Sequence, residues 1–141
     1  MYTSHNLRTG AGAYARVGVE SQAMSASPHQ LICMLFDGAR TAIGMARHHM
    51  AGNDVVAKGH AISKAVSIVD NGLKASLDAT AAGPAGAQLV GNLSALYDYI
   101  VQRLLLANLR DDASALDEAD RLLENVASAW REIGAGAAAA A

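Results

Sequence analysis

Apolar residues recur every three or four positions along most of this chain, in four successive runs. The clearest run contains Leu116, Ala119, Leu123, Val126, Trp130 and Ile133. Such spacing places the apolar side chains on one face of an α-helix. The pattern predicts four amphipathic helices, over residues of about 27–51, 54–81, 86–108 and 112–133.

Short turn and capping signals separate these runs. Ser27, Pro28 and Gln30 form a typical helix start, in which the serine hydroxyl accepts from a first-turn amide and the glutamine side chain bonds back to the serine. Gly52 and Gly83 lie in the turns that follow the first and second runs. The connections are too short for crossovers, so the helices are expected to alternate in direction along the chain.

The sequence therefore predicts an all-α fold, an antiparallel up-down four-helix bundle with a short N-terminal cap segment. The cap segment covers residues 1–26, and we expect part of it to be mobile. Residues 134–141 contain only glycine and alanine, so we expect a disordered tail. The residues predicted to form the structural core are Leu31, Leu35, Ile62, Val66, Leu93, Leu96, Leu123 and Trp130.

Composition supports a helical fold and narrows the kinds of partner. Of 141 residues, 31 are alanine, and aromatic residues make up only 4%, so the core must consist of small and aliphatic side chains. A net charge of −2 provides no basic surface for a nucleic acid. No stretch has the roughly 18 apolar residues of a membrane span, and a single cysteine, Cys33, fits a reducing compartment. We expect a soluble cytoplasmic protein.

No catalytic or metal-binding pattern emerges from the sequence. A di-iron site in a bundle needs Glu-x-x-His motifs, and none of the four glutamates lies three residues before a histidine. Covalent haem attachment needs a Cys-x-x-Cys-His motif, which is absent. These counts leave open a haem held by methionine and histidine. The prediction is a non-enzymatic protein without cofactor or metal.

One histidine offers an alternative function. Histidine phosphotransfer domains are also four-helix bundles, with a reactive histidine on an exposed helix face. Their motif reads His-x-x-Lys-Gly, whereas this chain has Lys58-Gly59-His60, the reverse order. Phosphotransfer at His60 is therefore the alternative to a binding function.

The third helix carries more apolar residues than one core-facing stripe requires. Val101, Leu105, Leu106 and Leu109 lie beside its core positions. Five glycines also fall inside the predicted helices, where each costs about 0.8 to 1 kcal/mol relative to alanine. A helix surface with few large side chains can accept a partner helix in a shallow groove. The pattern favours a binding surface on or near this helix.

The residues also resemble a known family. The stretch from Tyr14 to Gly38 is similar to the opening signature of the FliS family of flagellar export chaperones, and the segments 63–78, 92–110 and 116–130 match in order and spacing. The likeness covers nearly the whole chain. The loop before Asn92 departs from the family pattern, because it lacks the usual charged residues.

The resemblance implies a function in the flagellar type III secretion pathway. It implies a cytosolic chaperone that binds the disordered C-terminal segment of flagellin, prevents premature polymerisation and assists delivery to a component of the export gate. A homodimer of the free chaperone, formed through its open groove, is a further expectation. The residues expected to contact the partner are Tyr14, Val17, Tyr97, Tyr99, Val101, Leu105 and Leu109.

Overall fold

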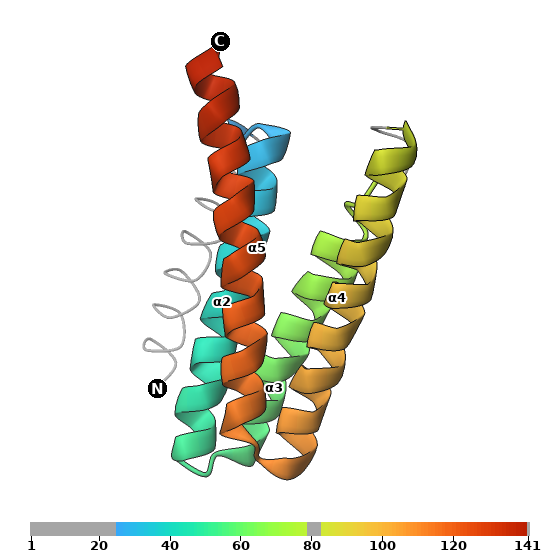
Figure 1. Cartoon of the computed structure of the whole chain (residues 1–141). Coiled ribbons are helices and arrows are strands. Elements are labelled where there is room, and N and C mark those ends of the chain that lie inside the picture. The colour runs from blue at the N-terminus through green and yellow to red at the C-terminus, as the bar shows by residue number, and fades with distance from the viewer. Residues whose placement is uncertain (1–24, 79–82, 141) are drawn as a thin grey trace. The chain divides into compact units, whose positions relative to one another are not determined.

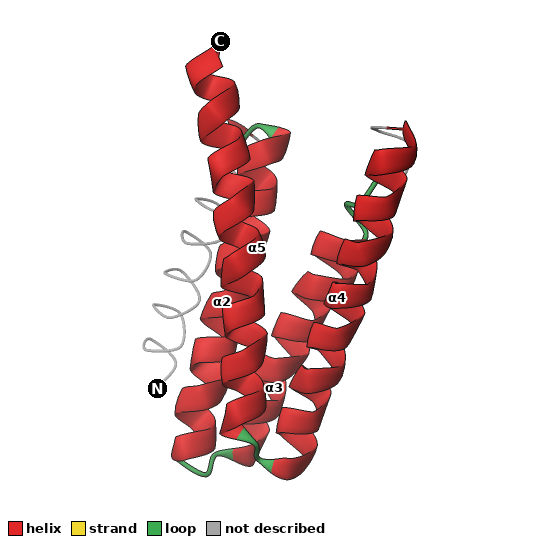
Figure 2. Ribbon diagram, in the orientation of Figure 1, coloured by secondary structure: helices red, strands yellow, loops and turns green. Residues whose placement is uncertain are grey.

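The computed structural model describes residues 25–78 and 83–140, with side chains up to residue 136. The elements are α2 (Pro28–Ala51), α3 (Val55–Ser67), the π-helix η1 (Ile68–Lys74), α4 (Gly83–Arg110) and α5 (Ala113–Ala140). Among these described residues there are helices, turns and short loops but no strand (Figure 2). The all-α fold predicted from the sequence is confirmed.

The chain divides into two units, residues 1–31 and 32–141. In the first unit the described part contains the start of α2. The Gln30 amide donates to Ser27 Oγ at 3.2 Å, and the Ser27 amide donates to Gln30 Oε1 at 2.9 Å. This reciprocal pair is the capping box expected from Ser27, Pro28 and Gln30. The predicted cap segment lies almost entirely outside the described residues.

Within the second unit, contacts between helices fix their relative directions. Arg40 and Arg47 of α2 pair with Asp120 and Asp117 of α5, so residue numbers rise along one helix as they fall along the other. Lys58 of α3 and Lys74 of η1 contact α4 in the same reversed order, at Asn108 and Asp98. The neighbouring helices α2 and α5, and likewise α3 and α4, are therefore antiparallel (Figure 1).

Small side chains make up much of the core. Of the eighteen buried hydrophobic residues in the described part of the chain, eight are alanines, and only Phe36 and Tyr97 are aromatic. The largest fully buried side chains come from every helix and include Phe36, Ile62, Ile100, Leu104 and Leu123. Alanine loses no side-chain entropy on burial. The core is therefore stabilised by many small packing contributions rather than by a few large side chains.

The predicted core residues differ in their degree of burial. Ile62 and Leu123 are fully buried. The half-buried residues that pack against the buried cluster are Leu35, Val66, Leu93, Leu96 and Trp130. Leu31 is a correction, because 37% of it is exposed. It occupies the first turn of α2, where few residues of the helix precede it and the apolar stripe has only begun.

The second predicted helix is not a single α-helix ending at residue 81. Its α-helical part ends at Ser67, and residues 68–74 form a π-helix, in which backbone bonds join residues five apart. A turn at residues 75–76 follows. Gly72 fits this region, because a Cβ built on it would come within 3.0 Å of Leu35 Cδ2. The close approach of α2 therefore favours glycine here.

The expectation of a disordered tail also needs correction. Helix α5 continues through Ala140, well beyond the predicted end near residue 133. Alanine has the highest intrinsic helix propensity, so a run of alanines can extend a helix that tertiary packing has already nucleated. Large side chains are required to bury a helix but not to continue one.

Gly44 provides a test of helix propensity, because packing does not require a glycine there. A Cβ built on Gly44 meets nothing within 4 Å, and the residue is exposed in the interior of α2. We expect Gly44→Ala to raise the free energy of unfolding by about 0.5 to 1 kcal/mol and the melting temperature by roughly 1 to 4 °C. Thermal denaturation monitored by circular dichroism measures this shift.

Gly72→Ala is the matched control for that substitution. The new methyl group would press on Leu35, so the gain in helix propensity is offset and the melting temperature should rise less than for Gly44→Ala. Equal gains at both positions would contradict the packing described at Gly72.

Candidate functional site

Helices α3 and α4 contact each other through polar groups at two separate levels. At one level, the buried Lys58 donates from Nζ to the Asn108 carbonyl oxygen at 3.1 Å and also pairs with Asp111. At the other level, Lys74 Nζ lies 2.7 Å from Asp98 Oδ1. Ten residues of α4 separate these levels, a rise of about 15 Å. The residues between them line the contact between the two helices.

We call the exposed line of contact between these helices the α3–α4 seam. On α4, Asp98, Val101 and Leu105 follow steps of three and four and so share the flank that carries Asn108. Val101 is half-buried, whereas 53% of Leu105 is exposed. Leu109 lies one turn beyond Leu105, and 79% of it is exposed. The seam thus offers apolar surface that this chain leaves open.

The other side of the seam comes from α3 and η1. Gly59 lies opposite Asn108, whose Oδ1 would be 4.0 Å from a Cβ built on that glycine. Ser63, Val66 and Asp70 continue the same flank in steps of four, three and four. Val55 precedes Gly59 by one turn, and 67% of it is exposed. Small or apolar residues therefore face Leu105 and Leu109 across the seam.

Charged side chains also lie where the seam reaches η1. The hydrogen bond to Asp98 is the main cause that raises the pKa of Lys74, and the negative charges of Asp98 and Asp70 add to it. The two carboxylates of Asp70 and Asp98 and the one ammonium group of Lys74 together carry a net negative charge. No described residue donates a hydrogen bond to the exposed carboxylate of Asp70.

The structure separates the residues that were expected to contact a partner. Tyr99, Leu105 and Leu109 are exposed on α4. Tyr99 is held by a hydrogen bond that its hydroxyl donates to Glu118 Oε1 of α5 at 2.9 Å, so it lies on the flank of α4 away from the seam. Tyr14 and Val17 fall outside the described residues.

Tyr97 is a correction, because only 3% of it is exposed and it belongs to the core. It lies four residues after Leu93 and seven before Leu104, on the same stripe of α4. Helical spacing alone could have shown this, since two tyrosines two residues apart cannot share a face. Tyr97 therefore takes no direct part in a surface site.

Burial raises the pKa of Tyr97 to about 12, compared with about 10 for an exposed tyrosine. The unfolded state therefore loses this proton first as the pH rises. The stability contributed by the neutral phenol is complete below pH 10 and is lost as the pH rises through about 12. We expect urea midpoints measured from pH 8 to 11.5 to fall less steeply for Tyr97→Phe than for the wild type. Equal slopes for Tyr97→Phe and the wild type would contradict this assignment.

Lys58 was not identified from the sequence as a structural residue, yet only 3% of it is exposed. Its ammonium group bonds a carbonyl in the last turn of α4 and pairs with Asp111, which has a positive φ of 51°. A cation in this place stabilises the negative end of the helix dipole. The partners lie about fifty residues away in the chain, so no local motif signals the contact. Lys58 holds the end of α4 that carries Leu109.

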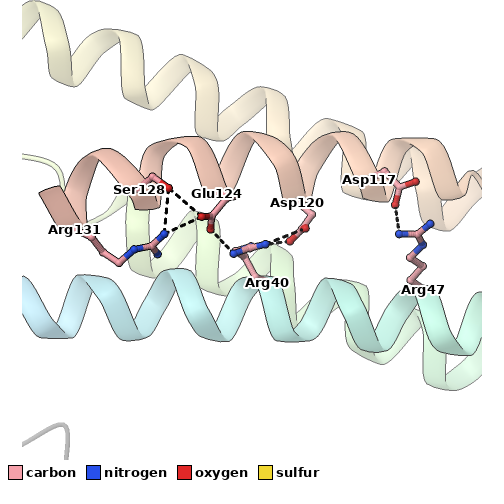
Figure 3. A network of polar contacts seen from close by, with 7 residues as sticks. All are labelled: Arg40, Arg47, Asp117, Asp120, Glu124, Ser128 and Arg131. Atoms are coloured by element: carbon pink, nitrogen blue, oxygen red, sulfur yellow. Dashed lines mark hydrogen bonds and ion pairs between the residues drawn. The ribbon is translucent and has the colours of Figure 1, made fainter.

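A second polar cluster joins α2 to α5 (Figure 3). Arg40 Nε donates to Asp120 Oδ1 at 2.9 Å, and its guanidinium also pairs with Glu124. Glu124 accepts further bonds from Ser128 at 3.0 Å and Arg131 at 2.8 Å. These two hydrogen bonds lower the pKa of Glu124, and the bond from Ser128 has the larger effect. The cluster is a network of ion pairs and hydrogen bonds that connects α2 with α5.

A shallow pocket of about 300 Å³ lies beside this network and is lined by Arg40, Thr41, Ile43, Gly44, Arg47, Asp117 and Asp120. Its charged residues already pair with one another, Arg47 with Asp117 at 2.6 Å. The pocket therefore offers few unpaired groups that could hold a small ligand.

The other candidate residues, His60 and Cys33, lie on α3 and α2. His60 is exposed on α3, and Cys33 is a free, half-buried thiol. The described residues contain no group of three or more His, Cys, Asp or Glu side chains that could hold a metal ion. None of the described helices is both long and apolar enough to span a membrane.

Comparisons with known proteins agree with one another. The family described as flagellar protein FliS matches residues 10–137. The flagellar secretion chaperone FliS of Salmonella typhimurium is 55% identical over 133 residues, which cover 94% of this chain and 93% of that protein. The Escherichia coli protein of the same name is 49% identical, over 87% of this chain and 88% of its own length. The Pseudomonas aeruginosa flagellar secretion chaperone FliSB is 39% identical, over 83% and 89% respectively.

Proposed function

Because the chain belongs to the FliS family of flagellar secretion chaperones, we propose that it binds the disordered C-terminal segment of flagellin. Bound in this way, the segment is kept from polymerising in the cytoplasm and is delivered to a component of the flagellar export gate. The chain acts by binding, without an enzymatic step. A chaperone role in flagellum biogenesis and protein export follows from family membership, and the client and the delivery step are the proposal.

The observation that carries this proposal is the open apolar surface of the α3–α4 seam. Val55, Leu105 and Leu109 are each more than half exposed, and helical spacing places each on the flank of its helix that borders the seam. Exposed apolar side chains that gather in one place mark a binding surface. An amphipathic segment that folds on binding would cover them and would hide its own assembly surface.

The N-terminal residues have a proposed role as well. In this proposal Tyr14 and Val17 belong to a segment that covers the client surface when no client is present, or helps to hold the client. A variant lacking residues 1–20 should then bind flagellin with altered affinity. Unchanged affinity and export would refute this part of the proposal.

The free protein is proposed to pair through the same seam, as a homodimer that the client dissociates. Sedimentation velocity of the protein alone and with the flagellin segment tests this. A monomer at all accessible concentrations would exclude the dimer.

The central experiment is co-purification with flagellin and with flagellin that lacks its C-terminal segment. We expect recovery of the full-length flagellin only. Equal recovery of both proteins would contradict the proposal, because the interaction would then not depend on the C-terminal segment. A chaperone variant with an altered seam, described in the Discussion, locates the binding surface.

A further inference from the structure

Lys58 is the one charged side chain that is buried in the part of the chain that the structure describes. An ammonium group without partners would be costly in such a place. Lys58 Nζ instead donates to the Asn108 carbonyl oxygen at 3.1 Å and pairs with the carboxylate of Asp111. Both partners belong to the C-terminal end of α4, so the buried charge of α3 serves the end of a single neighbouring helix.

This end of α4 has the hydrogen-bond pattern of a Schellman motif. The Asp112 amide donates to the Ala107 carbonyl oxygen at 3.2 Å, and Asp111 has a positive φ of 51°. Glycine usually occupies that position, and aspartate is one of the few other residues that tolerate it. The Asn108 carbonyl is among the last four of α4, which lack partners within an α-helix. Lys58 therefore caps α4 from a neighbouring helix.

The capped turn carries Leu109, which has the most exposed of the large apolar side chains in the described residues. Leu109 lies between Asn108 and Asp111, the two residues that Lys58 binds. On α3, Val55 lies about one turn before Lys58. The contact made by Lys58 thus fixes the height of Leu109 relative to Val55 along the α3–α4 seam.

We infer that Lys58 is a positioning residue for the client, because by capping α4 it holds Leu109 in the place that the flagellin segment binds. This inference rests on the proposed function. Without the cap the last turn of α4 would open more often, since the Asn108 carbonyl and Asp111 would lose their shared partner. The client would then have to order that turn as it binds, which lowers affinity. Lys58 itself is buried and acts through Leu109.

The test uses Lys58→Met in the full chain. Methionine has a similar length and removes the buried charge, while the carboxylate of Asp111 is exposed to water, so we expect the variant to fold. Lys64→Met is the matched control, because Lys64 is exposed on the same helix. Hydrogen exchange of the Asp112 amide, followed by NMR, reports on the last turn of α4. Fluorescence anisotropy with a labelled flagellin C-terminal segment, below the melting temperature of each variant, reports on affinity.

We expect Lys58→Met to exchange the Asp112 amide roughly 3- to 10-fold faster and to bind the segment roughly 3- to 10-fold more weakly. Lys64→Met should resemble the wild type in both measurements. A double-mutant cycle with Leu109→Ala identifies the route of the effect. Once Leu109 is absent, Lys58→Met should weaken binding by less than about twofold.

Two results would overturn the inference while leaving the proposed function intact. The first is an unchanged exchange rate of the Asp112 amide in Lys58→Met. The second is an equal loss of affinity with and without Leu109, which would mean that Lys58 acts only through general stability. If Lys58→Met does not fold, Asp111→Asn, which keeps a residue that tolerates positive φ, decides by the same measurements. Failure of the wild type to bind the segment would instead refute the proposed function, and the positioning role with it.

Discussion

Changing Leu105 and Leu109 together to alanine is expected to weaken binding of the flagellin C-terminal segment by about 10- to 100-fold. Burying a leucine side chain gains about 1.5 to 3 kcal/mol, and a tenfold change in affinity corresponds to 1.4 kcal/mol. Part of that gain is offset by the cost of ordering the segment, so the lower part of the possible range is expected. Isothermal titration calorimetry with the isolated segment measures the change.

Stability should hardly change in the same variant. Both leucines are more than half exposed in the free chain, and alanine is a strong helix former, so we expect the free energy of unfolding to change by less than about 0.5 kcal/mol. Met45→Ala is the matched control, because Met45 is also exposed but lies on α2. If Met45→Ala weakens binding as much as the double substitution, the seam is not the client surface.

The largest loss of stability is expected for Phe36→Ala. Phe36 is almost completely buried and is the only phenylalanine in the chain, in a core made largely of alanine. Removal of a buried phenylalanine costs about 3 to 5 kcal/mol, because the lost contacts and the remaining cavity both count. For a domain of this size the melting temperature should fall by roughly 6 to 20 °C. Differential scanning calorimetry provides the measurement.

Trp130→Ala is the comparison for Phe36→Ala. The tryptophan is larger, but it is only half-buried at the margin of the core, so its removal should cost less than that of Phe36. If Trp130→Ala proved the more destabilising change, the core would be centred closer to the end of α5 than described here. Binding of the flagellin segment below the melting temperature should persist in both variants.

Periodicity predicted the helices well because burial itself imposes the period. Leu116, Ala119 and Leu123 are all fully buried, as their steps of three and four require. The same reasoning extends to Tyr97, whose position relative to Leu93 and Leu104 already marked it as a core residue. The ends of the helices were less predictable, because they depend on capping and on alanine propensity rather than on burial.

Contacts between distant residues could not be predicted. The bond from Lys58 to the Asn108 carbonyl joins residues fifty positions apart and depends on the relative heights of α3 and α4. The approach of Leu35 to Gly72 likewise joins two helices and has no local sequence signal. For the α3–α4 seam, sequence analysis identified the apolar residues of α4. It did not identify the charged residues of η1, which only the structure places beside α4.

The π-helix also affects how this chain tolerates changes in length. A π segment contains about one residue more than the α-helix that would span the same turn. Deletion of one residue within 68–74 could therefore be accommodated locally by a return to α geometry, and the register of Val55 to Ser67 would be kept. In α5, whose buried face runs without such a segment, the same deletion would rotate every later side chain by about 100°. Homologues that differ in length by a single residue are therefore expected to differ at η1.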